Sequence, residues 1–306
     1  MTEPAVPAEV FDVRAWASLA GDRSRARAFV TALGARLGPA FRDPELIDIS
    51  DNPDARAPLM AALTHVRSGV LLLLIPGGTA TLGRDHGEAD ERPAHEARIA
   101  PFLLAREPLT IEHWELLDRR PALCEDLDDG MPAIGVSWTA AKAWLAEAGA
   151  GLRLPSEAEW ELACRAGTTT KYPWGEEMDL ARCWYGSNAY TRFSAHPPAE
   201  HRDDGIWNPL GLVDMCGNVF EWCEDDWIPG YDEFSGRLRD GRPRRAPDVS
   251  ERVARGGGWN DHCEHCASAF RFKARTDHEA DDFGLRPASS LDPELIRAAL
   301  AEARAA

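Results

Sequence analysis

The sequence predicts an α+β fold, in which a small N-terminal helical region precedes a body with little regular secondary structure. Three observations lead to this prediction. Residues 8–40 place apolar side chains three and four apart, as in an amphipathic helix. Short strand-like runs separated by turn residues begin at Gly69. After Gly167 neither period is sustained, and frequent Trp, Gly and Pro favour organisation by aromatic packing and turns.

We assign residues 1–68 to the N-terminal helical region. Its first helical pattern stops at Gly38-Pro39, and the Pro- and Asp-rich stretch 42–58 follows as a break. The next stretch, "LMAALTHVR" (residues 59–67), is predicted as a second helix. Helices placed ahead of a body in this way could dock a protein partner, although nothing in their sequence identifies one.

The body begins with strand-like runs such as "VLLLLI" (residues 70–75), and the acidic "RDHGEADERPAHE" (residues 84–96) is expected to be a loop. Two helices are predicted at residues 137–149 and 155–167. The second carries Ser156 and, three residues later, Glu159, which is a capping-box arrangement. Residues 291–306 are expected to form a helical tail.

Charge and cysteine content limit the partners. The net charge is −17, with 51 Asp and Glu against 34 Lys and Arg, which repels phosphate backbones and argues against nucleic acid as a partner. The longest aliphatic run is too short to span a bilayer, and the first residues show no export signal, so we expect a cytoplasmic protein with no membrane partner. Seven cysteines, an odd number, fit reduced thiols better than a disulfide framework.

The segment "DMCGNVFEW" (residues 214–222) is a candidate site for a hard cation. Asp214 and Glu221 offer carboxylates, and Gly217 permits a turn that points backbone carbonyls inward, as Ca²⁺ prefers. The alternative interpretation is a turn in which one carboxylate is hydrogen-bonded to backbone.

The segment "GGGWNDHCEHC" (residues 256–266) holds a second set of possible ligands. His262, Cys263, His265 and Cys266 could chelate copper or zinc from a loop. A structural zinc site would also require a second Cys/His pair at a fixed distance, and none is present. The alternative is a buried Cys266 beside surface histidines.

Eight motifs occur in an order that resembles one known family. They are "IPGGTATLG", "DERPAHEARIAPFLLAREPLT", "MPAIGVSWTAAKAWLAEAG", "LRLPSEAEWELACRAG", "YPWGEE", "NPLGLVDMCGNVFEW", "RVARGGGW" and "FGLRPA". The chain resembles the formylglycine-generating enzymes, also called sulfatase-modifying factors, across residues 69–290. The resemblance implies a C-type-lectin-like fold and a calcium ion held by Asp214, Gly217, Val219 and Glu221.

Members of this family oxidise a cysteine of a sulfatase peptide, using oxygen and copper held by two thiolates. The resemblance places the second of these cysteines at Cys266 and the first at Asp261. A carboxylate is a hard ligand and cannot replace a thiolate in linear Cu(I) coordination. Cys263 offers another sulfur, but its spacing from Cys266 requires a different loop path.

Three functional classes remain open. We favour a ligand- or protein-binding or accessory module that has lost the copper dithiolate. Its candidate ligand-contacting residues are Trp259, Asn260, His262, His265 and Arg271. The alternative is an oxidase of a peptide cysteine or another thiol, with Cys266 and Cys263 on copper or iron and Asp261 beside them. The third class is a regulatory or assembly component that docks a partner through its N-terminal helices.

Overall fold

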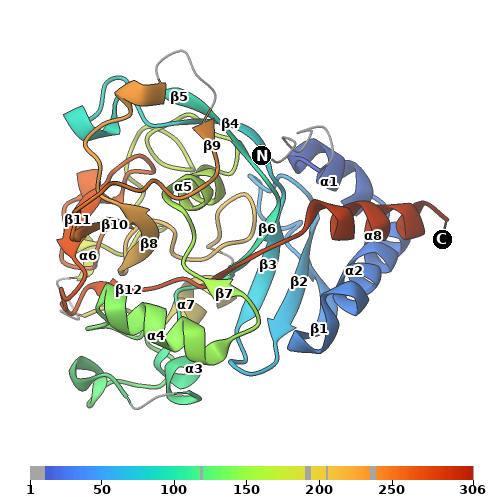
Figure 1. The fold of residues 1–306 in the computed structure, drawn as a ribbon, viewed down its shortest axis with the longest axis horizontal. Helices are drawn as coiled ribbons and strands as arrows, with labels where there is room; N and C mark the ends of the chain where they lie inside the picture. Colours follow the sequence, from blue (N-terminus) through green and yellow to red (C-terminus); the bar gives the residue numbers. More distant parts are fainter. Residues whose placement is uncertain (1–10, 118–119, 190–193, 205, 235–238, 306) are drawn as a thin grey trace.

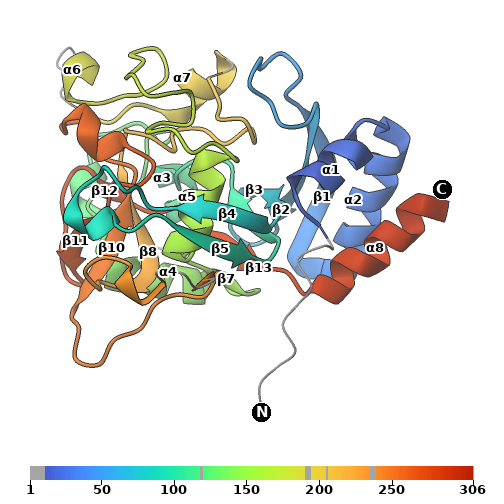
Figure 2. The same cartoon turned by 90° about the horizontal axis from the view of Figure 1, so that it is seen from above.

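A six-stranded sheet divides the molecule, with three helices on one side and the larger body on the other (Figures 1 and 2). The computed structural model describes residues 11–117, 120–189, 194–204, 206–234 and 239–305. Helices α1 (Val13–Ala20), α2 (Arg23–Leu37) and α8 (Pro293–Ala305) form the smaller side in both views. Within the described ranges, no helix combines the length and the apolar character that crossing a bilayer requires.

The strands form three sheets. The six-stranded sheet is antiparallel throughout, in the order β1 (Phe41–Asp48), β2 (Leu59–His65), β3 (Leu71–Ile75), β6 (Phe102–Ala105), β13 (Ala288–Ser290) and β7 (Leu152–Arg153). The second sheet has the order β11 (Phe272–Arg275), β10 (Glu251–Arg255), β8 (Phe220–Asp226) and β12 (Phe283–Gly284). The third contains β4 (Gly78–Leu82), β5 (His95–Ile99) and β9 (Arg239–Asp240).

The remaining helices are short. The α-helices are α3 (Ile111–Glu115), α4 (Trp138–Ala148), α5 (Glu157–Arg165), α6 (Gly186–Ala189) and α7 (Pro198–Asp203). Single 3-10 turns are η1 (Gly38–Ala40), η2 (Ala89–Glu91), η3 (Ala122–Cys124), η4 (Asp232–Phe234) and η5 (Cys263–Cys266).

The helix predicted at residues 59–67 is wrong, because this segment is the buried strand β2. It pairs with β1 on one edge and with β3 on the other, so the six-stranded sheet continues across residue 68. A short apolar run in the sequence does not distinguish a buried strand from a buried helix. Here the pairing with strands on both edges makes the segment a strand. The Pro-rich stretch read as a break contains β1, whose register shift between Arg42 and Glu45 accommodates Pro44 in an edge strand.

The predicted N-terminal helicity is confirmed, although it is divided between two helices. Asp22 begins α2, and its carboxylate accepts hydrogen bonds from the backbone of Ser24 and Arg25. Trp16 of α1 packs against Phe29 of α2, and its indole N–H donates to the Leu59 carbonyl of β2 at 2.9 Å. These contacts attach the helices to the sheet.

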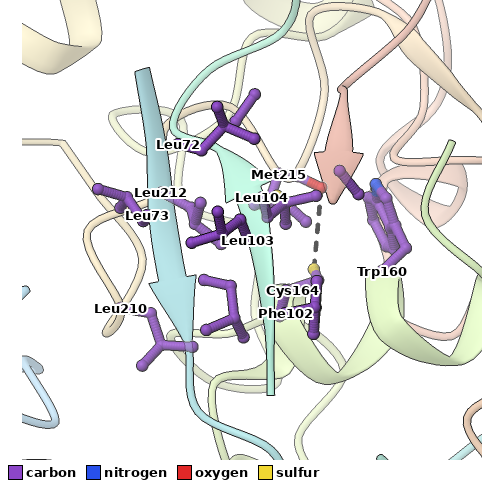
Figure 3. Packing of buried hydrophobic residues seen from close by; sticks show 14 of the residues in the cluster. Leu72, Leu73, Phe102, Leu103, Leu104, Trp160, Cys164, Leu210, Leu212 and Met215 are labelled. Carbon is purple, nitrogen blue, oxygen red and sulfur yellow. Dashed lines mark hydrogen bonds between the residues drawn. The ribbon is translucent and has the colours of Figure 1, made fainter. Parts of the chain in front are cut away.

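Helix α5 lies in the centre of the body. It begins with the predicted capping box, in which Ser156 and Glu159 exchange side-chain and backbone hydrogen bonds. Every residue of α5 is buried. Figure 3 shows Trp160 and Cys164 facing the leucines of β3 and β6, with the Cys164 thiol directed at the Met215 carbonyl. The predicted helices at residues 137–149, 155–167 and 291–306 are confirmed as α4, α5 and α8.

Candidate functional site

Two loops that the sequence singled out lie against each other at one end of the second sheet. The first, residues 214–219, leads into β8, and the second, residues 256–271, joins β10 to β11. The Gly217 amide donates to the Gly256 carbonyl at 2.7 Å, and the Trp259 amide donates to the Asn218 carbonyl at 2.8 Å. Gly217 has φ of 81°, and a Cβ there would lie 2.4 Å from the Trp184 carbonyl oxygen. The close approach of the Trp184 backbone to the first loop therefore requires glycine at position 217.

Asp261, at the position of the expected first cysteine, forms hydrogen bonds within its own loop. One carboxylate oxygen lies 2.7 Å from the His265 Nδ1 atom, and the other accepts the Gly258 amide at 3.1 Å. Both oxygens thus stabilise the turn between β10 and η5. Aspartate side chains commonly stabilise turns in this way, by accepting hydrogen bonds from nearby groups.

Cys266 and Cys263 differ in burial and in their hydrogen bonds. Cys266 is completely buried, and its thiol is 3.9 Å from the His262 carbonyl. Cys263 is half-buried, and its carbonyl accepts the Tyr172 hydroxyl at 2.9 Å. The thiol of Cys183 neighbours that of Cys266: burial raises the pKa of Cys183 well above its usual value, and a hydrogen bond with Cys266 raises it further.

Sequence reasoning missed Cys183 because it lies far from Cys266 along the chain and stands in no motif. A second buried pair, Cys164 and Cys216, has its sulfurs 3.8 Å apart. Tertiary packing alone brings these cysteines together, so spacing carried no signal for them.

Asp282 is an acidic group beside the altered loop that the sequence did not single out. Burial, together with the neighbouring charges of Asp261 and Asp281, raises the pKa of Asp282 to about 7. A Cβ at Gly258 would lie 2.7 Å from an Asp282 carboxylate oxygen, so this loop approaches Asp282 through a glycine. Titratable groups with such raised pKa values often mark functional sites.

Four of the predicted ligand-contacting residues remain near the surface. Asn260 and His262 are exposed, while Trp259 and His265 are half-buried. The Trp259 indole N–H donates to the Asp281 carbonyl at 3.0 Å, and His265 stacks on Phe270.

Arg271 does not lie with them. It is 3% exposed and pairs with the buried carboxylate of Glu157 at 2.5 Å, while its guanidinium stacks over Trp227. Burial alone would raise the pKa of Glu157, but Arg271 and Arg255 lower it to about 2. Arg271 therefore stabilises the interior, and a surface ligand cannot contact it as arranged.

The structure gives the two carboxylates of the predicted calcium set separate partners. Both oxygens of Glu221 accept hydrogen bonds from the buried Arg286 guanidinium, and one also accepts from the Trp160 indole at 2.7 Å. The Gly217 carbonyl accepts the Val219 amide at 3.0 Å. As arranged, these four residues do not fit a shared hard cation, because Arg286 supplies the positive charge at Glu221. Calcium binding stays a prediction of the resemblance.

Asp214, the other carboxylate of that set, lies between two histidines. Its Oδ1 atom is 2.6 Å from the Nδ1 atom of His201, and its Oδ2 atom is 3.4 Å from the Nε2 atom of His196. Burial alone would raise the pKa of Asp214, but these two side chains hold it well below its usual range. The histidines were not identified from the sequence, because they precede Asp214 in a separate Pro-rich segment.

The fold and the two loops define a protein of the formylglycine-generating-enzyme type. The model of the sulfatase-modifying factor enzyme 1-like domain matches residues 63–291. The chain therefore belongs to this family.

The chain is similar to proteins with two kinds of name. The serine/threonine-protein kinase pkn1 of Chlamydia pneumoniae is 30% identical over 251 residues, which are 72% of this chain and 38% of that protein. The formylglycine-generating enzyme of Streptomyces coelicolor is 33% identical over 199 residues, which are 59% of each chain. This chain thus spans 38% of the length of the kinase relative that it matches.

Solved structures agree on the fold. PvdO from Pseudomonas aeruginosa aligns with a TM-score of 0.64 at 22% identity, over 82% of this chain and 100% of that one. The Treponema denticola variable protein 1 aligns with a TM-score of 0.62 at 22% identity, over 74% of this chain and 98% of that one. The predicted α+β fold of the formylglycine-generating-enzyme type, with small N-terminal helices, is confirmed.

Proposed function

We propose that this protein is a divergent sulfatase-modifying-factor-like protein that acts as a ligand- or protein-binding accessory module, without the copper dithiolate of the formylglycine-generating enzymes. The observation that carries the proposal is Asp261. It occupies the place of the expected first cysteine, and both of its oxygens are engaged by His265 and Gly258. A carboxylate held in this way cannot take the role of a soft sulfur ligand to Cu(I).

The position of Cys266 supports the same proposal. In a copper-thiolate oxidase the substrate thiol must approach the metal, and this side chain has no exposed surface. The features next to it that solvent reaches are instead the half-buried Trp259 and the exposed Asn260 and His262. An aromatic ring with neighbouring hydrogen-bonding groups is a common arrangement in protein and peptide recognition, so we propose this surface as the binding face.

A thiol oxidase is the second candidate. The sequence predicts Cys263 as the second sulfur beside Cys266, but the hydrogen bond between Cys183 and Cys266 offers a buried pair of sulfurs that such an enzyme could use for copper or iron. Burial raises the pKa of the Cys183 thiol well above its usual value and so disfavours the thiolate that binds metal, and for this reason the binding role is preferred.

The deciding experiment combines metal analysis with a peptide assay. Purified protein is loaded with copper, and oxygen consumption and aldehyde formation on a Cys-x-Pro-x-Arg peptide are followed by an oxygen electrode and mass spectrometry. We expect no stoichiometric copper and no aldehyde. Copper retained by the wild type, lost in Cys266→Ser and accompanied by peptide aldehyde, would establish the oxidase instead, with Cys263→Ser and Cys183→Ser identifying its second sulfur.

A protein partner docked through the N-terminal helices, and a cytoplasmic location, also remain proposals. Helices α1 and α2 use their apolar faces to pack on β1 and β2, as the burial of Trp16, Phe29 and Leu33 shows. A partner would therefore meet their polar outer faces. To test this proposal, pull-down by the wild type is compared with pull-down by a variant that lacks residues 1–10 and carries charge reversals on α2, and the variant should lose the partner.

A further inference from the structure

Two histidines and one aspartate form a buried cluster close to the two loops described above. His196, His201 and Asp214 place one ligand atom each within 4.8 Å of one another. His196 precedes Pro197-Pro198, and His201 lies on α7, the short helix that Pro198 begins. Asp214 belongs to the loop that leads into β8. Two segments of the chain thus supply the three side chains.

The Nε2 atom of His196 differs from the other ligand atoms of the cluster because it is buried without a hydrogen bond to any described residue. The side chain of His196 is 1% exposed, and its Nε2 atom has no hydrogen-bond partner among the residues that the structure describes. Leaving a buried polar atom unpaired costs about 1–3 kcal/mol, so such atoms call for a specific partner. This nitrogen lies 3.4 Å from the Oδ2 atom of Asp214 without forming a hydrogen bond to it.

We propose that His196, His201 and Asp214 bind a divalent transition-metal ion, of which Zn²⁺ is the representative. Two imidazoles and one carboxylate are ligands that suit zinc and related ions, whereas Ca²⁺ prefers oxygen donors only. The site is distinct from the sulfur ligands of the family's copper chemistry, and it does not depend on the proposed binding function.

Distances within the cluster fit this assignment. Ligand atoms about 2.05 Å from a tetrahedral ion lie about 3.3 Å apart, close to the 3.4 Å between the His196 nitrogen and the Asp214 oxygen. The 2.6 Å contact between His201 and Asp214 is a hydrogen bond. It would lengthen by roughly 0.7 Å when an ion takes the place of the shared proton.

Surrounding groups hold the ligands in place. The Asn218 side chain accepts the His196 amide at 3.0 Å and donates both to the His196 carbonyl at 3.0 Å and to the second oxygen of Asp214 at 2.9 Å. Outer hydrogen bonds of this kind orient metal ligands and tune their affinity. Asn218 therefore fixes His196 and Asp214 relative to each other before any ion arrives.

His201 is the ligand through which solvent has access to the cluster. The side chain of His201 is 12% exposed, whereas those of His196 and Asp214 are each 1% exposed. An ion would therefore enter from the side of His201. Asp214 also lines a small cavity of about 20 Å³ together with Trp207 and Asn208, which is large enough for one water molecule.

The test uses metal-free full-length protein titrated with Zn²⁺ by calorimetry and with Co²⁺ by absorption spectroscopy. We expect about one ion per chain and a Co²⁺ spectrum without a thiolate charge-transfer band, because the ligands are nitrogen and oxygen. His201→Gln should weaken Zn²⁺ binding by at least about 100-fold, since removal of a ligand exceeds the loss from an outer partner. A large excess of Ca²⁺ should not displace the ion.

Matched variants make the outcome decisive. His262→Ala removes an exposed histidine of the other loop, and Cys266→Ser removes a buried thiol; both should retain full affinity. His196→Asn tests the buried ligand, and the more exposed His201→Gln decides the question if His196→Asn does not fold. The proposal fails if the wild type binds no ion, if His201→Gln binds with unchanged affinity, if the Co²⁺ spectrum shows thiolate, or if Ca²⁺ competes.

Discussion

Arg286 and Glu221 form an ion pair with no exposed surface on either side chain, and they join the strand segment β12–β13 to the start of β8. The guanidinium contacts both carboxylate oxygens and also donates to the carbonyls of Ala105 and Val213. One arginine thus connects three segments of the body. Breaking a buried pair costs more than the pair contributes, because one charge is left without a partner.

Replacement of Arg286 should therefore be strongly destabilising. We expect Arg286→Ala to lower the free energy of unfolding by about 3–5 kcal/mol, measured by urea denaturation. The exposed pair of Arg275 and Asp277 serves as the control, and Arg275→Ala should change little. Equal effects of the two substitutions would show that the buried pair has no special role.

The carboxyl group of Asp282 predicts how stability depends on pH. Its pKa of about 7 in the folded protein lies above that of an unfolded aspartate, so the folded state binds more protons between about pH 4 and pH 7. Stability should fall as pH rises through this window. Asp282→Asn should remove this part of the pH dependence. The difference in the free energy of unfolding between variant and wild type should therefore shift in favour of the variant by an amount on the order of 2 kcal/mol between pH 4 and pH 8.

The control for this measurement is Glu279→Gln, at an exposed position of the same loop whose charge is not among the causes of the raised pKa of Asp282. Thermal unfolding of both variants and of the wild type between pH 4 and pH 8 gives the comparison. An Asp282→Asn profile parallel to that of the wild type would mean that Asp282 titrates normally.

The close approach of the Trp184 carbonyl predicts that Gly217 tolerates no side chain. Gly217→Ala should lower stability by about 3 kcal/mol or more, since both the positive φ and the overlap with the Trp184 carbonyl oppose it. Gly38 has a similar φ of 75° but nothing within 4 Å of an added Cβ, so Gly38→Ala should cost only about 1 kcal/mol. The difference between these two variants in chemical denaturation isolates the steric part, and equal losses would contradict the close approach of Trp184 to Gly217.

The resemblance and the geometry lead to different predictions about calcium binding. The resemblance predicts an ion at Asp214, Gly217, Val219 and Glu221, whereas the structure satisfies Glu221 with Arg286. We expect a calcium chelator to leave the melting temperature unchanged, because an ion that binds only the folded state would raise it. A fall on chelation, restored by added Ca²⁺, would instead show that calcium occupies the set.

The sequence was sufficient to predict those elements whose signals are local. Helix α5 was predicted from its capping box, because Ser156 and Glu159 lie within one turn of each other. Strand β2 was missed, because its pairing with β1 and β3 decides its conformation and periodicity does not.

The candidate site shows the same limit. Asp261 was identified from its place in a motif, yet the proximity of Cys183 to Cys266 and of His196 to Asp214 arises only from tertiary packing. Arg271 was misplaced for a related reason: nothing in its local sequence indicates the buried Glu157 that neutralises it.

Strand β13 has a consequence for how the chain acquires this structure during synthesis. It lies between β6 and β7 in the six-stranded sheet, although both of those strands are made well before it. Helix α8, made after β13, then covers α2, which is made long before it. Until residues 288–305 leave the ribosome, β7 has no neighbour in its sheet and α2 has an uncovered apolar side. The sheet and the helical layer therefore cannot be completed before these residues emerge, and a ribosome stalled shortly before residue 288 would hold a protein that is still open to chaperones.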